Sequence, residues 1–322
     1  MTVPPLDRST IWPYEDGEPG EFHYSRFGNL TQSAAEQAMG ELERGDALLF
    51  ASGTGAGTAV VLAFLRPGAT IALAEGAYYG TSVLFRELET WGLGFVEFDQ
   101  TGEPPDGVDL IWLEAPSNPF LTMPDLEAAA RHKAPVLVDA TAATPVYLRA
   151  LDQGADYVLH SATKFLTGHH DVMLGAVVCR DPDHAQRLEE LRGRTGVVAA
   201  PESAWLLHRG LATLDVRMRR HTESAVAIAE RLAGHDAVER VRYPGFGGLL
   251  SFDVAGGADA ARKVETGTRQ IANATSLGGA RSTLETRRRW EGERVPDNLV
   301  RLSVGLEPLE ELWGDLNGAL SR

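Results

Sequence analysis

The chain has 322 residues, of which 43% are hydrophobic, so it can build a large core and more than one domain. Its 30 basic and 45 acidic residues give a formal net charge of −15, which argues against nucleic acid or an anionic membrane as the main partner. One cysteine, Cys179, excludes an intrachain disulfide, and neither a leader pattern nor a bilayer-long apolar run is present, so we expect a cytoplasmic protein.

The first part of the chain alternates between helix and strand patterns. Residues 1–30 are rich in Pro, Gly, acidic and aromatic residues and predict an extended arm. We then expect helices at 31–44, 54–65, 81–91 and 124–133, and strands at 47–51, 70–74, 94–98, 110–113, 136–139, 157–159 and 176–179. This alternation predicts an α/β fold with a mostly parallel sheet covered on both faces, where ligands bind at the carboxyl ends of the strands.

The C-terminal part has a different pattern. Leu207, Leu211, Leu214 and Met218 form one apolar stripe of a long helix. Beyond it we expect strands at 248–254 and 299–304 and helices at 258–265 and 308–320. The predicted organisation is therefore an arm (1–30), a large domain that includes the long connecting helix (31–234), and a smaller α+β domain (235–322).

Lysine is rare in this chain, and one of the three lysines lies in an unusual setting. Lys164 belongs to "HSATKFLTGHHDVMLG" (160–175), whereas the others are Lys133 and Lys263. Arginine matches or betters lysine as a permanent charge, but it does not deprotonate in proteins and cannot act as an amine nucleophile. The stretch therefore predicts covalent chemistry at Lys164.

Several polar stretches follow predicted strand ends and converge on one edge of the sheet. "ASGTGAGT" (51–58) opens a helix and suits a phosphate, "VDAT" (138–141) supplies a carboxylate, and "EAPSNP" (114–119) adds a carboxylate and an amide. Tyr78 and Tyr79 are rings that can stack on a cofactor. Pyridoxal 5′-phosphate (PLP) requires this set together with a lysine.

Other interpretations of the same residues remain open at this stage. "GTGAGT" also fits a dinucleotide loop, with Glu75 near the position of the ribose-binding acid, which would make the protein a nucleotide-dependent oxidoreductase. Asp139 could cap a turn. His169, His170 and Asp171 could bind a metal, but adjacent histidines point in different directions and no third ligand is evident, so we expect no metal.

Motifs spread over residues 24–320 resemble the Cys/Met-metabolism PLP enzymes, the group that includes cystathionine γ-lyase, cystathionine γ-synthase and methionine γ-lyase. "YSRFGNLT", "FASGTGA", "YYGT", "EAPSNP" and "VDAT" resemble family landmarks and occur in the family's order. "SATKFLTGHHDVMLG" closely resembles the family's lysine signature, and "RGLATLDVRM", "SLGG" and "LVRLSVGLE" match later landmarks. The resemblance implies the aspartate aminotransferase type of PLP fold (fold type I).

The resemblance implies a role in cofactor binding for several residues. Lys164 would form the Schiff base with PLP and move protons at Cα and Cβ. Asp139 would keep the pyridine nitrogen protonated, and Tyr78 would stack on the ring and assist proton transfer. The phosphate would be held by Gly53, Thr54, Ser161 and Thr163.

The resemblance also implies an oligomer and a substrate site. Tyr24 and Arg26, in the arm, would reach the phosphate of a neighbouring subunit in a homotetramer built as a dimer of dimers. Asn118, Ser276 and Arg301 would hold the amino-acid substrate, with a bidentate pair between Arg301 and the α-carboxylate. The competing explanation for Arg301 is an ion pair with an acidic residue such as Glu307.

The chain departs from the family pattern near the expected substrate site. Tyr79 replaces a glycine, Gly80 stands where methionine γ-lyases carry a cysteine, and Thr275 stands where cystathionine enzymes usually have Glu. A segment after "RYPGF" (242–246) is shortened, and "ETRRRWEG" (285–292) replaces the family's Pro-x-x-Met-Thr-His stretch. These differences leave the substrate open and the cofactor chemistry intact.

The sequence therefore predicts a PLP-dependent carbon–sulfur lyase for a sulfur-containing or β- or γ-substituted amino acid, as in trans-sulfuration. The alternative within the family is a transferase that replaces the β or γ substituent by a thiol. The oxidoreductase interpretation leaves Lys164, Tyr24 and Arg26 unexplained.

Overall fold

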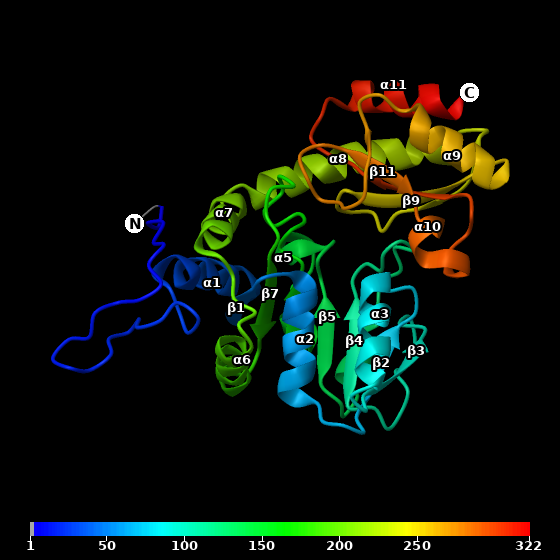
Figure 1. Ribbon diagram of the computed structural model, residues 1–322. Coiled ribbons are helices and arrows are strands. Elements are labelled where there is room, and N and C mark those ends of the chain that lie inside the picture. The colour runs from blue at the N-terminus through cyan, green and yellow to red at the C-terminus, as the bar shows by residue number, and fades with distance from the viewer. Residues whose placement is uncertain (1–2) are drawn as a thin grey trace.

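The computed structural model describes residues 3–322, so residues 1 and 2 of the expected arm lie outside the described part. The larger of its two sheets has seven strands in the order β1-β7-β6-β5-β4-β2-β3 (Figure 1). Their bounds are β1 Asp46–Phe50, β2 Thr70–Ala74, β3 Gly94–Phe98, β4 Leu110–Glu114, β5 Val136–Asp139, β6 Tyr157–His160 and β7 Gly175–Cys179. These positions match the apolar runs of the sequence closely.

Six strands of this sheet share one direction, and β7 alone runs the other way. The pairs β3–β2, β2–β4, β4–β5 and β5–β6 are parallel, while β7 is antiparallel to both β6 and β1. The expected, mostly parallel α/β sheet is therefore confirmed. The segments that follow β1, β4, β5 and β6 consequently leave the sheet at the same edge.

Helices cover both faces of this sheet, because each strand carries apolar side chains on both sides. α1 (Leu30–Glu43), α4 (Leu126–Ala130) and α7 (Pro201–Leu211) contribute to one buried cluster, and α2 (Gly53–Phe64), α3 (Tyr79–Glu89) and α6 (Pro182–Thr195) to the other. The short helices α5 (Thr144–Tyr147) and η1 (Ala150–Gln153) join β5 to β6.

Helix α4 is shorter than the expected helix at 124–133. The carboxylate of Asp125 accepts a hydrogen bond from the Ala128 amide, so the helix starts after this cap. At the other end, the Ala134 amide donates to Nδ1 of His132 rather than to a helical carbonyl.

The long helix expected after residue 200 is two helices, α7 and α8 (Leu214–Ala233), which are separated at residues 212 and 213. Leu207 and Leu214 are both buried, so the apolar stripe continues across the break. The guanidinium of Arg217 stabilises the break, because Nη2 donates to the Gly210 carbonyl at 2.7 Å. Tertiary contacts thus override the helical periodicity here.

The second sheet has five strands in the order β10-β11-β12-β9-β8. The bounds are β8 Val238–Arg242, β9 Leu249–Val254, β10 Ala272–Asn273, β11 Thr283–Thr286 and β12 Leu299–Ser303. The C-terminal part of α8 packs with α9 (Gly257–Gly267) and α11 (Leu309–Leu320) over this sheet in a third buried cluster. The short helices α10 (Arg288–Glu291) and η2 (Gly292–Arg294) connect β11 to β12.

The N-terminal segment extends away from the rest of the molecule (Figure 1). Bridges between Ile11 and Tyr24 and between Glu15 and Glu18 fold it back on itself. Ile11 and Tyr14 are 70% and 61% exposed. Within residues 3–322, none of the helices combines the length and the apolar character that a bilayer crossing requires.

Candidate functional site

A cavity of about 380 Å³ lies at the sheet edge where β1, β4, β5 and β6 end, and the second sheet contributes to its wall. It brings together most of the expected site residues, namely Gly53, Thr54, Tyr78, Asn118, Asp139, Ser161, Thr163, Lys164, Ser276 and Arg301. The strand direction explains this convergence, because these residues lie at or after the end of a strand of the shared orientation, except Ser276 and Arg301, which belong to the second sheet or its loops.

The start of α2 forms an anion cradle at one end of the cavity. The helix begins at Gly53, and Ser52 caps it by accepting a hydrogen bond from the Gly55 amide at 3.0 Å. A Cβ at Gly53 would lie 2.9 Å from the Cβ of Ser161, so only glycine allows this approach. The Thr163 hydroxyl donates to the Leu174 carbonyl at 3.1 Å, which leaves Ser161 as the freer hydroxyl.

One carboxylate oxygen of Asp139 accepts hydrogen bonds from the protein, and the other is free to bind a ligand. Its Oδ1 accepts hydrogen bonds from the Thr141 amide and hydroxyl. Among the residues that the structure describes, Oδ2 has no hydrogen-bond partner. Burial raises the pKa of Asp139, whereas the Thr141 bonds and the charges of His160 and Lys164 lower that pKa. A protonated ring nitrogen beside Oδ2 would favour the carboxylate in the same way.

The amine of Lys164 lies in the cavity and donates to the hydroxyl of Ser276 at 2.7 Å. Burial, followed by the charges of Arg301 and Arg287, lowers the pKa of Lys164 to about 8. Ser276 has a φ of +83°, a region that side chains other than glycine rarely adopt. This conformation directs its hydroxyl to Lys164 and its carbonyl to Arg301.

The ring of Tyr78 lines the cavity and packs edge-on against Tyr79, with ring centroids 5.0 Å apart. Its backbone amide donates to the buried carboxyl of Glu114. Burial, together with the nearby carboxylate of Asp139, raises the pKa of Glu114 well above its usual range. A Cβ at Gly80 would lie 2.4 Å from Cε1 of Tyr78, so a cysteine at this position requires another placement of the ring.

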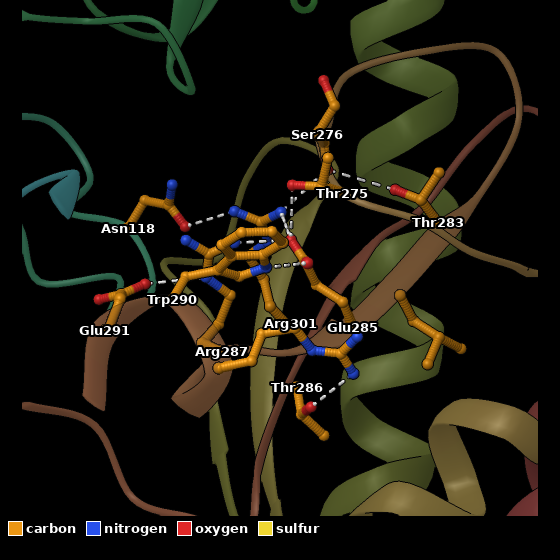
Figure 2. A network of polar contacts seen from close by, with 12 residues as sticks. Asn118, Thr275, Ser276, Thr283, Glu285, Thr286, Arg287, Trp290, Glu291 and Arg301 are labelled. Carbon is orange, nitrogen blue, oxygen red and sulfur yellow. Dashed lines mark hydrogen bonds and ion pairs between the residues drawn. The ribbon is translucent and has the colours of Figure 1, made fainter. Parts of the chain in front are cut away.

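Arg301 lines the cavity and is engaged by protein acceptors (Figure 2). Nη1 donates to Oδ1 of Asn118 at 3.0 Å, and Nη2 donates to the Ser276 carbonyl at 3.0 Å and to Oε1 of Glu285 at 2.7 Å. The competing explanation, an ion pair with an acidic residue, is therefore realised, and its partner is Glu285 rather than Glu307. Glu307 instead accepts hydrogen bonds from Ser282.

Sequence reasoning missed the group of side chains around Glu285 in Figure 2. Oε1 of Glu285 also accepts from Arg287 and Thr275, and Oε2 accepts from the indole of Trp290. Arg287 and Trp290 line the cavity beside Lys164. The run of arginines in "ETRRRWEG" was the available signal, but nothing in the sequence indicated which of them points inward.

Two of the expected site residues lie elsewhere in this chain. Arg26 donates to the Gly193 carbonyl at 3.0 Å, and its guanidinium lies over the ring of Tyr24. Neither residue lines the cavity of its own chain.

Glu75 and His169 are residues of the nucleotide and metal interpretations of the sequence. Glu75, the candidate ribose-binding acid, is exposed and does not line the cavity. Nδ1 of His169 lies 2.6 Å from the Thr167 carbonyl.

Comparison with known proteins identifies the family. The model of the Cys/Met metabolism PLP-dependent enzymes matches residues 1–321. The chain belongs to this family. A cystathionine γ-synthase from Mycobacterium tuberculosis is 39% identical over 94% of this chain and 87% of that protein. An L-methionine γ-lyase from Streptomyces avermitilis is 39% identical over 98% of this chain and 84% of that protein.

The fold agrees with the family assignment. The crystal structure of cystathionine γ-synthase from Xanthomonas oryzae pv. oryzae in complex with cystathionine superposes with a TM-score of 0.94 and 35% identity, covering 99% of this chain and 92% of that one. The protein is thus a PLP-dependent enzyme of a family that includes lyases and transferases, and the oxidoreductase interpretation is set aside. The helix start at Gly53, the open oxygen of Asp139 and the amine of Lys164 fit the phosphate, ring nitrogen and aldehyde of PLP.

Proposed function

We propose that the enzyme eliminates the β or γ substituent of a sulfur-containing or otherwise substituted amino acid. With uptake of one water molecule, the reaction yields a 2-oxo acid, ammonia and the released substituent, which is a thiol for a sulfur-containing substrate. The observation that carries this proposal is the amine of Lys164, which shares one cavity with Arg301 and has a pKa lowered to about 8. PLP, when bound, supplies the electron sink for the negative charge that develops at Cα.

Lys164 is the residue that would hold PLP covalently and then move protons at Cα and Cβ of the substrate. A lysine with a pKa near neutrality can both accept and return a proton, which an ordinary lysine does poorly. Ser276 orients the amine from one side. Asp139 would hold a proton on the ring nitrogen, and Tyr78 would cover the ring and assist transfer to the leaving group.

Arg301 would bind the α-carboxylate of the substrate, with Asn118 and Ser276 holding the guanidinium. Both hydrogens of Nη2 are already used, by Ser276 and Glu285. A substrate carboxylate that forms a bidentate pair must therefore share Nη2 with these acceptors or displace one of them. This requirement makes Glu285 part of substrate binding.

A second candidate is replacement of the γ or β substituent by a thiol. It is favoured by the 39% identity to a protein named cystathionine γ-synthase. Elimination and replacement would share the proton transfers by Lys164 and differ in whether the substituent is lost to give a 2-oxo acid or is exchanged for an added thiol.

An absorption spectrum of the purified enzyme tests the cofactor, and product analysis separates the two reactions. The assay follows 2-oxo acid release from cysteine, cystathionine, homocysteine, methionine and O-acyl-homoserines, with and without an added thiol. 2-Oxo acid formation that persists with thiol supports elimination, whereas a thioether product supports replacement. Borohydride reduction and peptide mapping should label Lys164, and a label at Lys133 or Lys263 would contradict the proposal.

We further propose a cytoplasmic homotetramer, a dimer of dimers in which Tyr24 and Arg26 complete the phosphate site of a neighbouring subunit. The exposed apolar side chains of the arm, and the absence of both residues from the lining of their own cavity, support this. Mixing inactive Lys164→Ala and Arg26→Ala chains should restore activity, because one type of hybrid site is intact. A fully active monomer in sedimentation would rule it out.

A further inference from the structure

We propose that Arg287 is a specificity-determining residue that binds an acidic group on the side-chain substituent of the substrate. The inference rests on the proposed function, in which an amino acid binds with its α-carboxylate at Arg301. It assigns a substrate class, namely amino acids whose β or γ substituent carries a second carboxylate.

The guanidinium of Arg287 is fixed on one side and unpaired on the other. Nη1 donates to Oε1 of Glu285 at 2.6 Å, and Nε donates to Oε1 of Glu291 at 2.8 Å. Nη2 is buried and has no hydrogen-bond partner among the described residues. A buried N–H group without a partner is costly, and arginine has donors to spare for a ligand. The residue lines the cavity, so a bound anion can meet this donor with small movements of its neighbours.

The ion pairs of Arg287 occupy Nη1 and Nε and leave Nη2 without a partner among the described residues. Oε1 of Glu285 is shared between Arg287 and Arg301, so one carboxylate serves two guanidinium groups. Burial raises the pKa of Glu291, and the charges of Arg287 and Arg301 oppose this rise. Burial, and then the charges of Arg301 and Arg287, lower the pKa of Lys164 against the opposing charges of Glu285 and Asp139.

Arg287 is also the one charged residue among those lining the described cavity that the proposed chemistry leaves without a role. Lys164 and Asp139 serve the cofactor, and Arg301 serves the α-carboxylate. Glu114 is held by the Tyr78 amide, and its raised pKa favours a neutral carboxyl group.

The surroundings of Arg287 suit the far end of a substrate side chain. The ring of Tyr79 has its centroid 5.6 Å from Cζ, and the lining residues Thr275 and Trp290 are uncharged. Burial raises the pKa of Tyr78, and the charge of Arg287, which lines the same cavity, opposes this rise. A carboxylate here could accept a hydrogen bond from the unpartnered Nη2 of Arg287, and such a charge-assisted bond is strong in a buried site.

Two unreactive amino acids of equal chain length test this inference on the PLP-loaded enzyme. L-2-Aminoadipate carries a terminal carboxylate and L-norleucine a methyl group. Binding is measured by calorimetry and by the change in cofactor absorbance. We expect the wild type to bind aminoadipate about tenfold or more tightly than norleucine. In Arg287→Met the two ligands should bind about equally. In Arg287→Lys the preference for aminoadipate should be smaller than in the wild type, because lysine has a single nitrogen and Glu285 would already bind to that nitrogen.

Arg288→Met is the matched control, since Arg288 is 43% exposed, bonds to the Val295 carbonyl and does not line the cavity. It should retain the wild-type ratio. The inference would be overturned if Arg287→Met kept the wild-type affinity ratio, or if it bound both ligands more weakly by the same factor. If Arg287→Met does not fold, an unchanged affinity ratio in Arg287→Lys would overturn the inference instead.

Turnover gives an independent check. O-Succinyl-L-homoserine and O-acetyl-L-homoserine break the same bond, and only the first has a free carboxylate on its substituent. Loss of Arg287 should lower kcat/KM selectively for the succinyl ester. If no amino acid changes the cofactor spectrum of the wild type, the proposed function fails. If amino acids bind, but substitution of Arg287 changes neither the affinity ratio of aminoadipate to norleucine nor the kcat/KM ratio of the two esters, only the present inference fails.

Discussion

In the cofactor-free protein, the amine of Lys164 should titrate near pH 8 rather than at 10.5. Burial disfavours the charged ammonium, and the charges of Arg301 and Arg287 disfavour it further. The shift increases the fraction of neutral amine at pH 7 by about 300-fold, to roughly one molecule in ten. Since only the neutral amine attacks an aldehyde, this shift would speed covalent capture of PLP.

Trace labelling with acetic anhydride measures this pKa directly. The extent of Lys164 acetylation is followed by peptide mass spectrometry across the neutral to alkaline range, and its midpoint gives the pKa. Lys133 and Lys263 are labelled in the same sample and correct for reagent loss. Arg287→Met should raise the Lys164 midpoint, because it removes a nearby positive charge.

A Lys164 midpoint at the ordinary lysine value would refute the electrostatic reasoning, since neither burial nor the arginines would then act on the amine. An unchanged or lower midpoint in Arg287→Met would show that the charge of Arg287 does not act on the amine of Lys164.

The remaining predictions address single side chains. Asp139→Asn should keep the cofactor in its absorption spectrum and lose about a hundredfold or more in turnover, because an amide does not favour a protonated ring nitrogen; near-normal turnover would make Asp139 structural. Arg301→Lys should raise KM at least about tenfold, since lysine has no fork, and wild-type kinetics would contradict that role. Glu285→Gln should lower the free energy of unfolding by about 3 kcal/mol in urea, because it leaves two buried arginines short of a counter-charge. Glu293→Gln, at a 96% exposed carboxylate of the same segment, is its control and should change stability by less than about 0.5 kcal/mol.

The shared cavity of the residues that we assign to the cofactor could be anticipated from the sequence, because their signals are local. A short apolar run followed by a small polar stretch identifies a strand and its carboxyl end. In a mostly parallel sheet, such ends meet at one edge whatever the order of the strands. Lys164, Asp139 and the start of α2 at Gly53 are therefore brought together by strand direction alone.

The substrate side of the site depended on strand register, which the sequence did not reveal. β11 was not expected as a strand, and its antiparallel pairing with β12 places Glu285 directly opposite Arg301. Cross-strand neighbours share a face of the sheet, so this register made Glu285, and not Glu307, the partner of Arg301. The inward position of Arg287, rather than of Arg288, follows from the turn after β11.

The sequence by itself thus determined the alternation of helices and strands and the lysine loop, because these are set by side-chain periodicity over a few residues. Only the tertiary structure decided the break between α7 and α8, where Arg217 reaches the carbonyls of Phe165, Leu166 and Gly210. It likewise decided the charge arrangement around Arg301, whose contacts with Asn118 and Glu285 span 183 and 16 residues. Contacts between distant segments depend on how whole sheets and helices pack, and no local pattern encodes that packing.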